Sequence, residues 1–206
     1  MNRNLILLAL CQGLFLTNNV TFIAVNGLVG LSLAPFGWMA TLPVMAYVVG
    51  GALSTGLVAK AQSRWGRKRT FQTGLAVAFV SALMCAWSAQ TRNFPLLCAS
   101  TLLAGYYSAN AGLYRFVAAE LARPDWKEKA VSLVLAGGLL GAVIGPNLAV
   151  YTRDLLSVPY VGIYLSLSVV ALLAIGVVSV IQFPAAPARK PGPPGRIIPA
   201  GAPARR

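Results

Sequence analysis

The sequence contains no histidine, and its acidic residues are few: Glu120, Asp125, Glu128 and Asp154. Without histidine there is no His-based metal site, no bis-histidine haem site and no catalytic triad with a His base. The four acids all lie in turns between long apolar segments or at their ends, so no carboxylate sits in the middle of one. We therefore predict that the chain is not an enzyme, with no catalytic residue, no metal site and no cofactor.

Charge is also scarce, because charged residues make up 10% of the chain, against about 25% in a typical soluble domain. Hydrophobic residues make up 57%, and a chain of this composition cannot cover itself with polar surface. We predict a membrane protein with the lipid bilayer as its surroundings. The net charge of +13 comes from short turns and a C-terminal tail, with no basic stripe on one face, so we predict no nucleic-acid partner.

Six apolar segments of membrane-spanning length follow one another along the chain. The predicted fold is an all-α polytopic membrane protein in which residues 1–183 form a bundle of six transmembrane helices, over about 5–29, 38–59, 70–89, 95–119, 130–150 and 158–181. Residues 184–206 are rich in Pro, Gly, Ala and Arg and cannot bury enough apolar area to fold. We predict that they form a disordered cytoplasmic tail.

The basic residues are distributed unequally between the two sides of these six spans. Fourteen of the lysines and arginines fall on the side of both termini, whereas only Arg92 and Arg153 fall on the other, with Arg115 set aside. Loops rich in Lys and Arg stay in the cytoplasm. We therefore predict cytoplasmic termini and a multi-pass protein of the plasma membrane, which in a bacterium is the inner membrane.

Two of the predicted helices carry polar side chains on one face. In the first, polar amides recur every seven residues, and in the fourth, polar and aromatic residues fall within one arc at 100° per residue. The resulting candidates for lining a substrate cavity are Gln12, Asn19, Asn26, Tyr107, Asn110, Tyr114 and Arg115. Two alternatives remain open: the amides serve only to join helices, and Arg115 extends to the interface without touching a substrate.

A basic turn between the second and third segments carries the most specific motif. The turn resembles the loop after the second helix of the major facilitator superfamily, which reads G-x-x-x-D-R-x-G-R-[RK], at Arg64, Gly66, Arg67 and Lys68. Ala59 and Ser63 stand where that pattern has glycine and aspartate, so the match is partial. The resemblance implies a loop that gates transport, whereas any positively charged cytoplasmic hairpin would contain similar residues.

The fifth segment has a glycine at every fourth position, followed by proline: Gly137, Gly141, Gly145 and Pro146. A stripe without side chains allows another helix to approach closely, and the proline removes a backbone hydrogen bond so that the helix can bend. These residues are similar to the facilitator motif G-x-x-x-G-P-x-x-G-G, although Ala149 and Val150 replace its last two glycines. The resemblance implies a carrier helix; a close-packed kink without transport is an equal alternative.

Together the two motifs imply the N-terminal six-helix half of a facilitator, built of two inverted three-helix repeats. Such a permease moves a small solute or drug by alternating access and needs a second six-helix half as partner. We also predict that a lone bundle exposes its polar path-lining face. A non-transporting scaffold or assembly subunit, or a truncated remnant of a transporter, is the alternative, and an intramembrane enzyme comes third. The sequence does not indicate the substrate.

Overall fold

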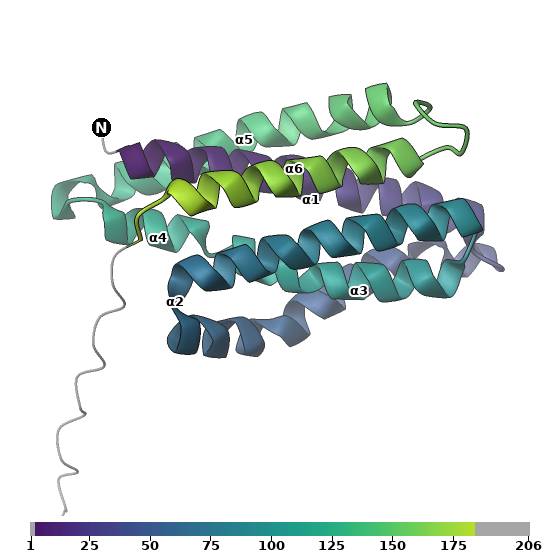
Figure 1. Cartoon of the computed structure of the whole chain (residues 1–206), viewed down its shortest axis with the longest axis horizontal. Coiled ribbons are helices and arrows are strands. Elements are labelled where there is room, and N and C mark those ends of the chain that lie inside the picture. The colour runs from purple at the N-terminus through teal and green to yellow at the C-terminus, as the bar shows by residue number, and fades with distance from the viewer. Residues whose placement is uncertain (1–2, 184–206) are drawn as a thin grey trace, which may run out of the picture.

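The structure is a computed structural model that describes residues 3–183, so the predicted tail at 184–206 lies outside the described residues. All regular elements in this range are helical: α1 (Arg3–Leu33), η1 (Gly37–Thr41), α2 (Leu42–Thr91), α3 (Phe94–Ala111), α4 (Tyr114–Leu121), η2 (Pro124–Trp126), α5 (Lys127–Thr152) and α6 (Val161–Val180). The long helices run side by side along one direction (Figure 1). The chain is therefore all-α, as predicted.

Several of these helices are suited to a bilayer. Within the described range, four stretches are long and apolar enough to cross a membrane: Arg3–Leu33, Gly37–Thr91, Pro124–Thr152 and Val161–Val180. The outward side of α5 exposes large apolar side chains, among them Leu139, Leu140 and Val143. A continuous apolar surface of this kind is costly in water but suits contact with lipid or another apolar helix.

The helix α2 reverses direction at one glycine. Gly66 has φ 78° and ψ 168°, whereas its neighbours stay helical, and Figure 1 shows the chain turning back at this point. Glycine adopts a positive φ without the steric cost that a Cβ imposes. The sequence predicts a non-helical turn from Ala59 to Arg69; in the structure the helical turns continue through these basic residues and only Gly66 departs.

The segment predicted as one helix over 95–119 is divided in the structure. It begins as predicted near Pro95, after Asn93 accepts a hydrogen bond from the Leu96 amide at 3.0 Å. The break comes after Ala111, where the Leu113 amide donates to the Asn110 carbonyl at 3.1 Å, three residues back. Gly112 has a low helix propensity, and such a tightened turn marks a local break, so α4 starts as a separate helix.

Two apolar clusters form the core, and α1 passes through both. Toward one end α1 contributes Leu8, Cys11 and Phe15 to the first cluster, and toward the other it contributes Phe22, Val25 and Val29 to the second. Between them, buried α1 positions are polar: Thr17, Asn18 and Thr21. The bundle therefore has a polar layer near the middle of its length, between two apolar layers.

One end of the molecule gathers the basic residues, and we call it the basic end. It holds the start of α1, the Gly66 reversal, α4, the start of α5 and the end of α6 (Figure 1). The Asn4 side chain donates to the Gln182 carbonyl at 3.1 Å, which joins the two ends of the described chain.

Candidate functional site

The polar side chains of α1 point to three different neighbours. Asn18 donates to the Leu167 carbonyl of α6 at 3.1 Å, and Asn19 donates to the Tyr47 hydroxyl of α2 at 2.6 Å. Farther along, the Tyr164 hydroxyl of α6 donates to Asn26 at 2.8 Å. Each of these contacts satisfies a polar group that would otherwise lack water at membrane depth. Asn26 is thus tied to α6, away from the other predicted lining residues.

An aromatic and polar cluster joins α1, α2 and α3 in the middle of the bundle. The Tyr47 hydroxyl, which accepts from Asn19, also contacts Ser108 of α3. Next to Ser108, the Tyr107 ring packs edge-on against Phe15 of α1, with 5.5 Å between the ring centroids. Asn19 and Tyr107, two of the predicted lining residues, are therefore brought into the same region. Tyr47 links them, although the sequence pattern did not single it out.

Three predicted lining residues have buried polar atoms with no hydrogen-bond partner among the described residues. These atoms are the Tyr107 hydroxyl, both side-chain heteroatoms of Asn110 and Oε1 of Gln12. Asn110 lies against Gly74 of α2, and Gln12 lies against Gly138 of α5. Removing an amide or hydroxyl from water without a partner costs about 1–3 kcal/mol in proteins. The centre of the bundle therefore carries hydrogen-bonding groups that the described residues leave unpaired.

Tyr114 and Arg115 point in different directions. Tyr114 is buried in the same apolar cluster as Tyr107 and Phe15. The Tyr114 ring is buried against Phe71 of α2, with 4.8 Å between ring centroids. Arg115 is exposed, and its guanidinium lies over the Phe116 ring at 5.1 Å from the centroid. This position fits the alternative in which Arg115 reaches toward the interface.

Six of the seven predicted lining residues are buried or partly buried in this conformation, and Arg115 is the exception. Gln12, Asn26, Tyr107, Asn110 and Tyr114 are all buried, and Asn19 is partly buried. The prediction that a lone bundle exposes them is therefore wrong, because α2, α5 and α6 pack over these faces. Two cavities, of about 610 Å³ and 300 Å³, lie toward opposite ends of the helices, and neither is lined by these residues.

The basic turn is fastened to two other helices at the basic end. Arg67 forms an ion pair with Glu120 at the end of α4. The ammonium of Lys68 donates to the Ser179 carbonyl in the last turn of α6 at 2.6 Å, where a cation also meets the negative end of the helix dipole. Arg64 is exposed. Gly66 supplies the reversal that brings Arg67 and Lys68 to their partners.

The glycine stripe of α5 lies directly against α1. A Cβ added at Gly137 would meet the backbone of Ala9 at 2.5 Å, and one added at Gly145 would meet the Thr17 carbonyl oxygen at 2.8 Å. At Gly141 it would overlap the backbone of Gly13. Thr17 also donates to the Gly141 carbonyl at 3.0 Å, and Pro146 follows within the same helix. Only glycine allows this approach.

The sequence analysis singled out the polar residues of α1 but not the residues that form hydrogen bonds with them. Tyr47 and Tyr164 supply hydroxyls to Asn19 and Asn26. Each is a tyrosine in an apolar helix, and a phenolic hydroxyl at membrane depth needs a partner, so this signal was available. Glu120 was predicted only as part of a solvated turn, since its pairing with Arg67 depends on the tertiary fold.

Comparison with known proteins gives a consistent result. The family model described as the Major Facilitator Superfamily matches residues 5–203. The riboflavin transporter RfnT of Brucella anthropi is 33% identical over 183 residues, which cover 88% of this chain and 46% of that protein. The uncharacterized MFS-type transporter YddS of Bacillus subtilis is 28% identical over 110 residues, or 53% of this chain and 25% of its own length. The chain thus spans about half the length of RfnT.

Proposed function

The chain belongs to the major facilitator superfamily, and we propose that it is a secondary transporter, or the N-terminal half of one, that moves a small solute by alternating access. Proteins of this family are membrane transporters and not enzymes, so a bilayer and a small-molecule substrate follow from the membership. The observation that carries the proposal for this chain is the set of unpartnered polar atoms on Tyr107, Asn110 and Gln12 in the middle of the bundle.

In the proposed site these atoms would bind the solute. They come from α1 and α3, next to the aromatic rings of Phe15 and Tyr107, so a bound solute would meet both ring edges and neutral hydrogen-bonding groups. A site whose polar groups are left unpaired discriminates strongly for a ligand that pairs them. The site would open when the bundle moves, since its residues are buried in the present conformation.

For the architecture, we propose that residues 1–183 form one six-helix half. The two arms of α2, over 42–65 and 67–91, would each cross the bilayer, and α3 with α4 would cross together. Inverted repeats are supported by two matching contacts: α5 meets α1 at Gly141 and Gly13, and α2 meets α3 at Gly50 and Gly105. If the first three spans are superposed on the last three, the first span matches the fourth and the second matches the fifth. The contact between α1 and α5 then corresponds to the contact between α3 and the first arm of α2.

The orientation follows from the charges. We place the basic end in the cytoplasm of a bacterial inner membrane, with both termini and the tail at 184–206 on that side. A thiol-specific, membrane-impermeant reagent applied to intact cells should label a cysteine at Arg92 and leave one at Ser63 untouched. If the reagent labelled both cysteines from outside the cell, this topology would be wrong.

At the basic end, we propose that the contacts of the turn with α4 and α6 hold the present conformation and break during transport. Arg67 with Glu120, and Lys68 with the end of α6, hold the Gly66 reversal against α4 and α6. Both contacts are partly exposed, so they are weak enough to break and reform. The second six-helix half would supply the surface against which this end rocks, as alternating access requires.

Riboflavin is the substrate to test first, because RfnT carries that name and covers most of this chain. A flavin is planar, with carbonyl and imide groups that suit the unpartnered atoms of Asn110 and Tyr107. Uptake is measured in a riboflavin-requiring bacterial strain that expresses the gene in its native coding context, with the 206-residue chain alone as the comparison. We expect uptake that Asn110→Ala reduces, and none from the chain alone.

The outcomes separate the claims. If the protein transported another solute but not riboflavin, only the choice of riboflavin as the substrate would be wrong. If well-folded protein transported none of a broad panel of solutes, the transport proposal would be wrong. The scaffold alternative would then be favoured. Uptake by the isolated chain, shown to be monomeric in detergent, would remove the requirement for a second half.

A further inference from the structure

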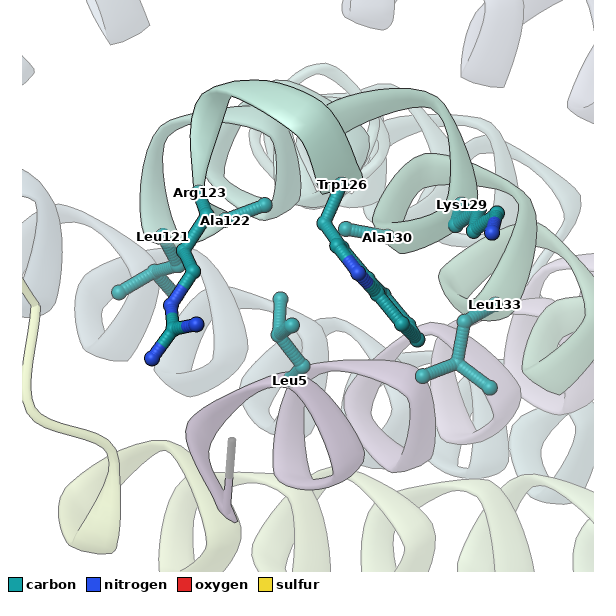
Figure 2. A pocket seen from close by; sticks show the side chains of 8 residues that line it. All are labelled: Leu5, Leu121, Ala122, Arg123, Trp126, Lys129, Ala130 and Leu133. Carbon is teal, nitrogen blue, oxygen red and sulfur yellow. The ribbon is translucent and has the colours of Figure 1, made fainter. Parts of the chain in front are cut away.

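The cavity of about 610 Å³ at the basic end is separate from the proposed solute site. It lies between the start of α1, the segment that joins α4 to α5, and the first turns of α5. Its floor is apolar, formed by Leu5, Ala130 and Leu133. Figure 2 shows the Trp126 ring and the Arg123 side chain extending toward α1 on either side of Leu5.

The charges around this cavity are sorted by sign. Arg123 and Lys129 line it, and the Lys129 ammonium lies 5.1 Å from the centroid of the Trp126 ring. The acids of the same segment do not line it: Asp125 and Glu128 are exposed elsewhere, and Glu120 is turned toward Arg67. The segment contains both acidic and basic residues, but of these only basic residues line the cavity.

We propose that this cavity binds an anionic phospholipid. Arg123 would hold the phosphate, because a guanidinium is a strong donor to phosphate oxygens, and Lys129, on the other side of Trp126 (Figure 2), would add to the positive potential that attracts an anionic headgroup. An acyl chain would cover Leu5, Ala130 and Leu133. The Trp126 ring lies between Leu5 and Leu133 (Figure 2), and tryptophan is common at the level of lipid headgroups.

A lipid fits better than a free anion for a physical reason. A free phosphate would pair with Arg123 but would leave the apolar floor uncovered, whereas a lipid would occupy both parts of the cavity. Basic pockets at helix ends on the cytoplasmic side bind the headgroups of anionic lipids. The inference concerns a site at the membrane surface and holds whichever solute the protein carries.

The experiment uses Trp126 as the reporter in the full chain. Trp38, Trp65 and Trp87 are exposed and are replaced by phenylalanine. The protein is reconstituted into vesicles of phosphatidylcholine in which either brominated phosphatidylglycerol or brominated phosphatidylcholine is increased, and bromine quenching of Trp126 gives the relative association of the two lipids. With two cations in the site we expect a preference for phosphatidylglycerol of roughly 30-fold, which corresponds to about 1 kcal/mol for each cation.

The variants locate the effect. The double variant R123Q/K129Q should reduce the preference to near onefold, and the matched control K127Q, an exposed cation in the same segment that does not line the cavity, should keep it. All three residues are exposed, so folding should be unaffected, and the circular dichroism spectrum checks this. Excess inorganic phosphate should leave the preference in place.

Three results would overturn the proposal. The first is equal quenching by the two lipids in the parent protein. The second is a preference that survives in R123Q/K129Q or is lost equally in K127Q, which would indicate only general surface charge. The third is loss of the preference on addition of phosphate, which would identify a site for a free anion.

Discussion

At the basic end of the bundle, charged side chains are paired between helices, whereas at the centre several neutral residues have polar atoms without a partner among the described residues. Arg67 pairs with Glu120, and Lys68 binds the end of α6. In contrast, the polar atoms of Tyr107, Asn110 and Gln12 are unused among the described residues. The unpaired groups at the centre lie where water is scarce and are costly, whereas at the basic end these charged groups have partners and Gln62, in the turn, keeps one buried amide nitrogen without one among the described residues.

This difference indicates what each region is for. An unpaired polar group at membrane depth lowers the stability of the folded protein without forming a structural contact. Such groups are characteristic of pathways for solutes or ions. A partly exposed ion pair contributes little to stability, about 0–1 kcal/mol, and can open without unfolding the protein. This difference supports our proposal that the centre binds a solute and that the contacts at the basic end break and re-form.

The largest expected effect comes from separating α1 from α5, which encloses the centre at Gln12 and Gly138. We predict that G141L prevents stable folding, because its side chain would overlap the Gly13 backbone, and overpacking costs about 1–3 kcal/mol even where side chains can shift. The matched control is G176L in α6, where an added Cβ meets nothing within 4 Å. Size-exclusion profiles in detergent should show aggregated G141L and monodisperse G176L; equal behaviour would contradict the packing.

A smaller effect should separate function from stability at the centre. We predict that N110L lowers transport about tenfold or more while thermal stability stays equal or rises, because leucine has a similar shape and removes an unpaired amide. The control is N18L, which deletes the hydrogen bond to the Leu167 carbonyl and should lower stability by about 0.6 kcal/mol. A marked loss of stability in N110L would show that Asn110 has a structural partner.

The fold was predictable from the sequence to the extent that it depends on local pattern. Apolar length predicted an all-α chain with helices long enough to cross a membrane, and the positions of Gly66 and of the Gly137 to Gly145 stripe indicated a turn and a close contact. The division at Gly112 was not predicted, because a single glycine is tolerated in many helices. Nor was the enclosure of Asn110 by Gly74, which depends on how α2 returns along α3.

The smallest effect should come from the basic end. We predict that E120Q, which removes the charge that pairs with Arg67, changes stability by less than about 1 kcal/mol and transport by no more than a few fold. The change in stability should vanish at high salt, because exposed pairs are screened. E128Q, an exposed acid of the same segment, is the control. A loss of transport as large as that of N110L would place essential chemistry at this end.

The most direct test is whether the centre becomes accessible during transport. In protein with Cys11, Cys85 and Cys98 replaced by alanine, N110C is compared with L75C, a fully buried apolar position next to Gly74. The gene is expressed in its native coding context, and membranes are treated with a small polar methanethiosulfonate reagent. We predict that N110C is modified and L75C is not. Inertness of N110C, or equal modification of both, would contradict a solute site at the centre of the bundle.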